Sequence, residues 1–157
     1  MPVRQFFTTL IAFAALVSAW IPLPASAADG VVVVTSANDV KTTMDKLEKI
    51  LTSKGITVFA RINHAHGAKT IGQSLPPMEL LIFGNPKLGT PLMQKNQQMG
   101  LDLPMKALVY EAPDGKTYIA YNDPAYLSKR HGVTEPAKVF ETMTGALKNF
   151  TAAAAAK

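Results

Sequence analysis

The sequence predicts an α+β fold in which helices pack on a single mixed sheet of about five strands. Two patterns carry this prediction. Short apolar or alternating runs alternate with segments whose apolar residues recur at helical spacing, and glycine, proline or asparagine separate them. The 157 residues are also 48% hydrophobic and 17% charged, which is typical of one folded domain with a core. The expected order of elements is β-α-β-β-α-β-β-α.

The first 27 residues have the features of a secretory signal peptide. Arg4 precedes an apolar stretch over residues 6–23, and the small residues Ala-Ser-Ala follow at 25–27. We expect cleavage after this motif, leaving a single domain over 28–157 that is periplasmic or secreted and has no stable membrane span. A retained membrane anchor is the alternative, because the apolar stretch is close to the shortest length that spans a bilayer.

Composition excludes several classes of function. The chain has no cysteine, which rules out disulfides, thiol chemistry and acylation at a cysteine. Its net charge of +5 comes from lysine and arginine residues that are scattered rather than clustered. This distribution suits a soluble surface better than a nucleic-acid interface, so we expect no nucleic-acid partner. We also expect no cofactor.

Local patterns predict the elements of the first half of the mature chain. The β-branched run at 31–34 predicts a strand. Asp39 supplies a helix cap, and apolar residues at helical spacing over 40–51 predict a helix that Gly55 terminates. Residues 56–64 alternate, which predicts a second strand. The residues expected on its core-facing side are Ile56, Val58, Ala60, Ile62 and His64.

The second half begins with an expected loop over residues 65–77 and a third strand over 78–84. Thr90 and the proline that follows it predict the start of a second helix, which Gly100 ends. Two strands within 106–123, joined by Pro-Asp-Gly, form an expected hairpin.

The remaining elements are helical. Asp123 and the proline after it open a short helix that Gly132 ends. Thr134 and Pro136 open the last helix, which an alanine-rich tail follows.

One face of the predicted sheet needs a cover, either from the chain itself or from a second copy. If strand-helix-strand crossovers place the first two helices on one face, the other face is too apolar for solvent. That face is expected to carry Phe59, Leu81, Phe83, Leu108, Tyr110, Ile119 and Tyr121. Either the C-terminal helix or a second copy of the chain must cover it, and we expect a homodimer.

Four segments, taken in order, resemble a known family. They are FARINH at 59–64, ELLIFGNPKLGTPLM at 79–93, GLDLP at 100–104 and YNDP at 121–124. Together they look like the bacterial and archaeal family called domain of unknown function 302, over about residues 30–135. The resemblance implies a small α+β fold that is often dimeric, and it brings no catalytic residues. Asn63 stands where the family pattern leads us to expect an aspartate.

A candidate binding site follows from the expected topology. His64 ends the second strand and Glu79 begins the third, so an antiparallel turn places both at one edge of the sheet. If the second helix is a crossover, the fourth strand starts at this edge and the fifth ends there. The candidate ligand-binding residues are therefore His64, Glu79, Asp102, Asn122 and Asp123.

Three functions suit this edge. The preferred hypothesis is a module that binds a small ligand or another protein. An alternative is a periplasmic copper- or zinc-binding protein that uses His64, His66 and Met105. A second alternative is an enzyme with a His64–Glu79 acid–base pair. A purely structural role is also open for these residues. Glu79 or Asp123 could be the hydrogen-bond partner of a partly buried histidine, and Asp123 also suits a helix cap.

Overall fold

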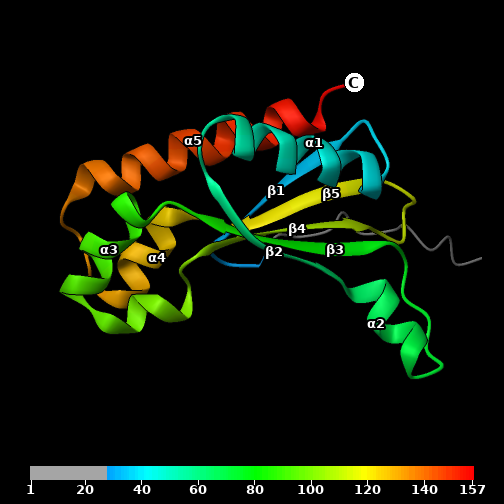
Figure 1. Cartoon of the computed structure of the whole chain (residues 1–157), viewed down its shortest axis with the longest axis horizontal. Coiled ribbons are helices and arrows are strands. Elements are labelled where there is room, and N and C mark those ends of the chain that lie inside the picture. The colour runs from blue at the N-terminus through cyan, green and yellow to red at the C-terminus, as the bar shows by residue number, and fades with distance from the viewer. Residues whose placement is uncertain (1–27) are drawn as a thin grey trace, which may run out of the picture.

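The computed structural model describes residues 28–157, and the expected signal peptide lies outside the described residues. Five strands form one sheet in the order β1-β5-β4-β3-β2, which confirms the α+β class (Figure 1). The strands are β1 (Val31–Ser36), β2 (Thr57–Asn63), β3 (Met78–Gly84), β4 (Met105–Glu111) and β5 (Thr117–Asn122). All four strand pairs are antiparallel, so the sheet is not mixed as predicted. The connection through α1 joins β1 and β2, which are the two edge strands and do not pair with each other.

The helices occupy three places around this sheet. They are α1 (Val40–Ser53), α2 (His64–Thr70), α3 (Pro86–Lys95), the 3-10 turn η1 (Gln97–Leu101), α4 (Pro124–His131) and α5 (Ala137–Ala155). Helices α1 and α5 lie side by side on one face (Figure 1). Helices α3 and α4 form a lobe with η1 at one end of the sheet, and α2 projects from the other end on the side away from α1 and α5.

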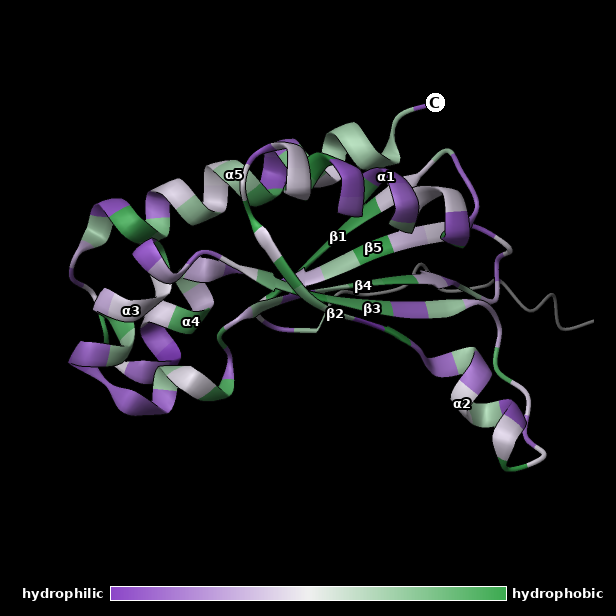
Figure 2. Ribbon diagram, viewed as in Figure 1, coloured by the Kyte–Doolittle hydropathy of each residue, from purple (hydrophilic) through white to green (hydrophobic). Residues whose placement is uncertain are grey.

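The core lies between the sheet and the α1–α5 layer. Alternate residues of the three central strands are buried there, and in Figure 2 the hydrophobic colour follows these strands. They are Leu81, Phe83, Met105, Ala107, Val109, Thr117, Ile119 and Tyr121, against Met44, Leu47 and Leu51 of α1 and Met143 and Leu147 of α5. The expectation that Leu81, Phe83, Ile119 and Tyr121 face away from the first helix is therefore wrong.

The opposite side of the sheet, which we call the open face, has no helix over it in the described part of the chain. Its residues are Val31, Val33, Thr35, Ala60, Ile62, Met78, Leu80, Ile82, Lys106, Leu108, Tyr110, Tyr118, Ala120 and Asn122. None of them is buried, whereas most of the residues that alternate with them on β3, β4 and β5 are. The C-terminal helix was one expected cover, but it lies beside α1 because its apolar face continues the same core.

A β-bulge changes the expected faces of β2. Val58 pairs with Phe83, but Ala60 pairs with Ile82, so Phe59 is the extra residue. Val58 consequently faces the core, whereas Ala60 and Ile62 lie on the open face. The predicted single row from residue 56 to His64 is broken at this point.

Two helix starts also differ from the prediction. Asn63 caps α2 by accepting a hydrogen bond from the His66 N–H at 2.7 Å, so a helix occupies part of the expected loop. Asn85 caps α3 in the same way through the Lys87 N–H at 2.9 Å, five residues before the expected cap at Thr90. The hairpin and the capping of α4 by Asp123 agree with the prediction.

The alanine-rich tail is part of α5 rather than an appendage. Ala154 and Ala155 are buried, and the Ala37 N–H donates to the Ala155 carbonyl at 2.8 Å. The Asn38 amide nitrogen donates to the Ala156 carbonyl at 2.7 Å. These contacts fix the C-terminal end of α5 beside the loop between β1 and α1.

Candidate functional site

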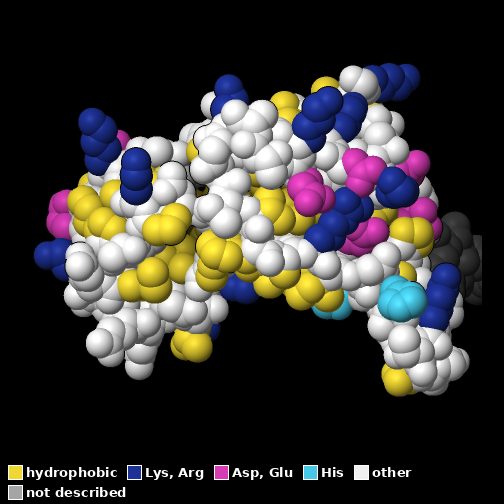
Figure 3. Space-filling view, viewed as in Figure 1, with side chains coloured by type: hydrophobic (Ala, Val, Ile, Leu, Met, Phe, Trp, Pro, Cys, Tyr) yellow, Lys and Arg dark blue, Asp and Glu magenta, His cyan; other side chains and the backbone are white. Residues whose placement is uncertain are grey.

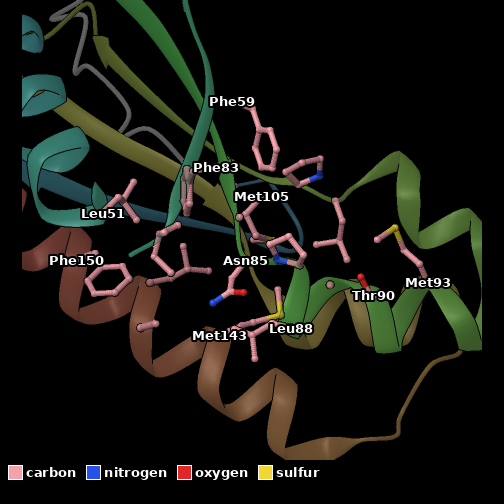
Figure 4. A pocket seen from close by; sticks show the side chains of 18 residues that line it. Leu51, Phe59, Phe83, Asn85, Leu88, Thr90, Met93, Met105, Met143 and Phe150 are labelled. Atoms are coloured by element: carbon pink, nitrogen blue, oxygen red, sulfur yellow. The ribbon is translucent and has the colours of Figure 1, made fainter. Parts of the chain in front are cut away.

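An apolar cavity of about 200 Å³ lies at the end of the sheet where β3 stops and β4 begins. Side chains from α1, β2, α3, the η1–β4 loop and α5 surround it (Figure 4). Its lining consists of Leu51, Ile56, Phe59, Phe83, Gly84, Asn85, Pro86, Leu88, Gly89, Thr90, Met93, Leu103, Pro104, Met105, Met143, Ala146, Leu147 and Phe150. Concave, mostly apolar sites with a few polar atoms are where small ligands bind.

The β2 bulge and two glycines shape this cavity. The bulge directs Phe59 to the cavity border, where its ring stays 54% exposed (Figure 4). A Cβ added at Gly84 would lie 3.3 Å from the Pro104 Cβ, and one added at Gly89 would lie 3.7 Å from Leu103. The absence of side chains at both positions keeps this end of the cavity open.

Polar atoms are few and lie on α3. The Asn85 Oδ1 atom is used by the helix cap, while its amide nitrogen donates no hydrogen bond within the described part of the chain. The Thr90 side chain also lines the cavity. The free Asn85 amide can donate to one polar atom of an otherwise apolar ligand, and the Thr90 hydroxyl lies at another place in the lining (Figure 4). The thioethers of Met93, Met105 and Met143 add a soft, adaptable wall.

The expected His64–Glu79 pair is not formed. Strand pairing does place Asn63 opposite Glu79, so the end of β2 and the start of β3 share an edge as predicted. The chain then turns into α2, and His64 is exposed as its first residue. Glu79 instead accepts hydrogen bonds from the Arg61 Nε atom at 2.6 Å and from the Asn63 amide at 3.2 Å.

Arg61 organises this edge. Its guanidinium reaches Asp45 at 2.7 Å and Glu48 at 3.1 Å on α1, in addition to Glu79. Partial burial alone would lower the pKa of Arg61, but the hydrogen bonds with the three carboxylates raise it well above its usual range. The cluster joins α1 to the sheet edge and leaves Glu79 without a free carboxylate oxygen for acid–base work.

The other predicted ligand-binding residues lie at the opposite end of the strands, where β3 stops and β4 begins. Because β3 and β4 are antiparallel, β4 starts beside the end of β3 and far from Glu79. Asn122 therefore ends β5 at that edge, and Asp123 caps α4 with its Oδ1 atom 2.9 Å from the Ala125 N–H. The expected crossover is wrong, since α3 and η1 return the chain to the end at which β3 finished. Met105 lies at this edge too, and it lines the cavity.

Asp102 has a histidine partner that the sequence did not reveal. The His131 Nε2 atom lies 2.6 Å from Asp102 Oδ2, and the two side chains are only 5% and 11% exposed. Arg130 is 3.5 Å from the same oxygen, and the Asn96 amide donates to the His131 carbonyl at 2.9 Å. This cluster fastens the end of α4 to η1. It borders a shallow hollow with Lys95 and Glu135 that is separate from the apolar cavity.

The proposed metal ligands do not converge. His64 and His66 lie on α2, where residues two apart do not share a face, while Met105 lies at the far edge of the sheet. Within residues 28–157, no three histidine, aspartate or glutamate side chains are grouped so that they could hold a metal ion.

Most of the cavity lining cannot be predicted from the sequence. No local pattern connects Phe59, Asn85 and Met143, because a β-bulge and long-range packing bring them together. One local signal was available: the Gly-Asn-Pro at 84–86 marks a helix start directly after a strand.

Comparisons with known proteins are consistent with this fold. The model of the family "Domain of unknown function DUF302" matches residues 32–150. A solved structure, the uncharacterized conserved protein DUF302 from Bacillus stearothermophilus, aligns with a TM-score of 0.63 and 23% identity over 82% of this chain and 97% of that chain. At that identity the likeness shows the shared fold.

Curated relatives are longer proteins. Fluoride-specific ion channel FluC 1 of Brucella suis biovar 1 is 41% identical over 126 residues, which cover 79% of this chain and 50% of the relative. The protein of the same name from Brucella abortus biovar 1 is also 41% identical, with 47% of it covered. The chain thus spans about half the length of the curated relatives it matches. Among residues 28–157, no helix is long and apolar enough to cross a membrane. The family match over most of the chain shows that this protein belongs to the DUF302 family.

Proposed function

We propose that the protein is a binding module for a small, largely apolar ligand, and that the cavity between α3 and α5 is the binding site. The observation that carries the proposal is the lining itself: aliphatic, aromatic and thioether side chains surround a cavity of about 200 Å³. When an apolar ligand displaces water from an exposed apolar cavity of this kind, the free energy of the system falls, which favours binding.

The volume restricts the ligand. Since a cavity of about 150 Å³ accommodates benzene, a space of this size takes roughly eight non-hydrogen atoms. The Asn85 amide provides a donor for one oxygen atom at the α3 end. The ligand class that fits best is therefore a monocyclic aromatic or short aliphatic molecule with one hydroxyl or carbonyl group.

We further propose that the module acts outside the cytoplasm, after removal of residues 1–27, and that it corresponds to the part of the longer relatives that does not form the pore. The proteins named fluoride-specific ion channels must span a membrane to conduct, whereas no described helix of this chain can do so. A ligand-binding domain attached to a channel is a reasonable arrangement for those relatives.

The methionines of the chain allow a direct test. In protein labelled with ¹³C at the methionine methyl groups, Met93, Met105 and Met143 report on the cavity and Met44 reports on the core away from it. Titration with benzyl alcohol and with ethylbenzene, which have equal numbers of heavy atoms, should shift the three cavity signals in a saturable way. We expect benzyl alcohol to bind more tightly, because its hydroxyl can reach the Asn85 amide.

Two outcomes would refute the proposal. One is that neither compound shifts the cavity methyl signals at millimolar concentration. The other is that both compounds shift the Met44 signal as much as the cavity signals, since a general effect on the fold would then replace site binding. Replacing Asn85 by Asp keeps the cap and removes the amide donor, so this variant should bind ethylbenzene normally and lose the preference for benzyl alcohol.

A further inference from the structure

The chain between η1 and β4 forms one side of the apolar cavity. Leu103, Pro104 and Met105 line the cavity in succession, and we call residues 103–105 the wall. The wall lies against two glycines: a Cβ added at Gly89 would be 3.7 Å from Leu103, and one added at Gly84 would be 3.3 Å from Pro104. A glycine offers no side chain that could interlock with the wall. The position of the wall therefore depends on the groups that hold its ends.

Pro104 lies at the mouth of the cavity. A Cβ added at Gly84 would be 3.3 Å from the Pro104 Cβ and 3.7 Å from the Phe59 ring, so both rings lie next to this glycine. Phe59 is 54% exposed. Figure 3 shows hydrophobic side chains at the surface between the lobe of α3 and α4 and strand β2. A displacement of Pro104 away from Gly84 would consequently widen the opening between solvent and the cavity.

Asp102, the residue directly before the wall, is bound to α4. Its Oδ2 atom lies 2.6 Å from the His131 Nε2 atom, and both side chains are largely buried. A carboxylate only accepts hydrogen bonds, so His131 is the donor in this contact. Lys106 donates to the carbonyls of Asp102 and Pro104 at 3.3 and 3.2 Å, which joins the two residues on either side of Leu103. The wall is thus expected to move together with Asp102.

His131 is a fixed point on the rest of the fold. Its carbonyl accepts a hydrogen bond from the Asn96 amide at 2.9 Å. Leu127, one turn earlier on α4, is fully buried in the core. Asp123 caps the start of α4, and Gly132, with a φ of 62°, ends it. The hydrogen bond from His131 to Asp102 therefore connects the end of the wall to a well-anchored helix.

We propose that the Asp102–His131 hydrogen bond is a latch that keeps the wall closed over the cavity and controls how fast a ligand enters and leaves. The inference rests on the proposed function of the cavity. Neither Asp102 nor His131 is among the described residues that line the cavity, so both are positioning residues that act through the wall. Ligand exchange passes through a minor, open state in which this bond is broken.

Breaking the latch should change the exchange rates more than the affinity. Loss of a hydrogen bond between buried groups should raise the population of the open state about fivefold or more. Entry and exit through that state become faster by the same factor. The affinity falls only in proportion to the closed fraction that is lost, so the Kd should change by less than about twofold while the closed state still dominates.

Relaxation dispersion of ¹³C-labelled methionine methyl groups measures these rates. Met143 lines the cavity from α5, so its signal during a titration with benzyl alcohol gives the rates of entry and exit. Asp102→Ala removes the acceptor and should raise both rates about fivefold or more. Asp102→Asn keeps an acceptor oxygen at the same place and should restore rates close to those of the unmodified protein.

Two further variants separate the latch from a general loosening of α4. His131→Leu breaks the same hydrogen bond from the other side and leaves Asp102 with Arg130, 3.5 Å away, so it should also raise the rates. It replaces Asp102→Ala if that variant does not fold. The matched control is Ser128→Ala, which removes a hydrogen bond of 2.6 Å to the Val133 carbonyl at the same end of α4. This control should leave the rates unchanged.

A comparison without ligand distinguishes failure of the latch from failure of the proposed function. Met105 belongs to the wall, whereas Met143 does not. In ligand-free Asp102→Ala, exchange broadening of the Met105 methyl signal should increase while the Met143 signal stays unchanged. Asp102→Asn should show neither change.

Three results would overturn the latch. They are unchanged exchange rates in Asp102→Ala and His131→Leu, exchange that is equally fast in Ser128→Ala, and equal broadening of Met105 and Met143 in the ligand-free variants. If benzyl alcohol leaves the cavity signals of the unmodified protein unshifted, the proposed function fails instead. The ligand-free signals of Met105 and Met143 then decide whether Asp102 and His131 position the wall.

Discussion

Filling the cavity from α5 should abolish ligand binding without harming the fold. Ala146 lines the cavity and is half-buried on α5. Replacing it by Phe places an aromatic ring in the space that the ligand would occupy. Since benzene fills a cavity of roughly 150 Å³, the ring would take about three quarters of the volume of about 200 Å³.

The size of the effect follows from the same volume. A ligand of about eight heavy atoms that gains roughly 0.6 kcal/mol per atom binds with about −5 kcal/mol, or a Kd of about 0.2 mM. The volume left in Ala146→Phe is too small for such a ligand, so the Kd should rise at least tenfold. The added ring replaces water against apolar side chains, so the free energy of unfolding should rise by about 0.5–2 kcal/mol.

Isothermal titration with benzyl alcohol and urea denaturation measure these two effects. The control is Ala152→Phe, which adds the same ring at an exposed position of α5 and should leave affinity unchanged. If Ala146→Phe binds benzyl alcohol with the affinity of the unmodified protein, the cavity is not the binding site. If binding is lost together with stability, disruption of α5 packing explains the result instead.

Three other predictions concern the stability and the processing of the chain. Gly30→Ala should lower the free energy of unfolding by about 2 kcal/mol or more in urea titrations, because residue 30 has a φ of 77° and a Cβ would overlap the ring of Tyr126. The hydrogen bond from Lys41 lowers the pKa of Asp45 below 3.8, so folding releases a proton and stability should fall as pH drops below about 4, with a smaller fall in Asp45→Asn. Mass spectrometry of protein exported by a bacterial host should find Ala28 as the first residue.

Elements fixed by local chemistry were predictable. The hairpin depends on Gly115, whose φ is 74°, and on Asp114, which accepts a hydrogen bond from the Lys116 N–H at 3.0 Å. Asp123 caps α4 with its own side chain. In each case the residues that determine the structure lie within a few positions of one another, so a single sequence contains the information.

Other features depend on distant packing. Asn85-Pro86 and Thr90-Pro91 are equivalent helix-start signals in the sequence, and the structure uses the first, so that α3 begins directly after the end of β3. The bulge at Phe59 needs one extra residue opposite β3, which no local pattern in 57–63 reveals. The single shift places Ala60 and Ile62 on the open face and removes them from the predicted core.

The candidate site failed for a topological reason. The predicted proximity of Glu79 to Asp102 and Asn122 requires the second helix to be a crossover. The antiparallel pairing of β3 with β4 separates Glu79 from those residues by the length of a strand. It also leaves Asp102 free to pair with His131, a partner 29 positions away that could not be identified without the fold.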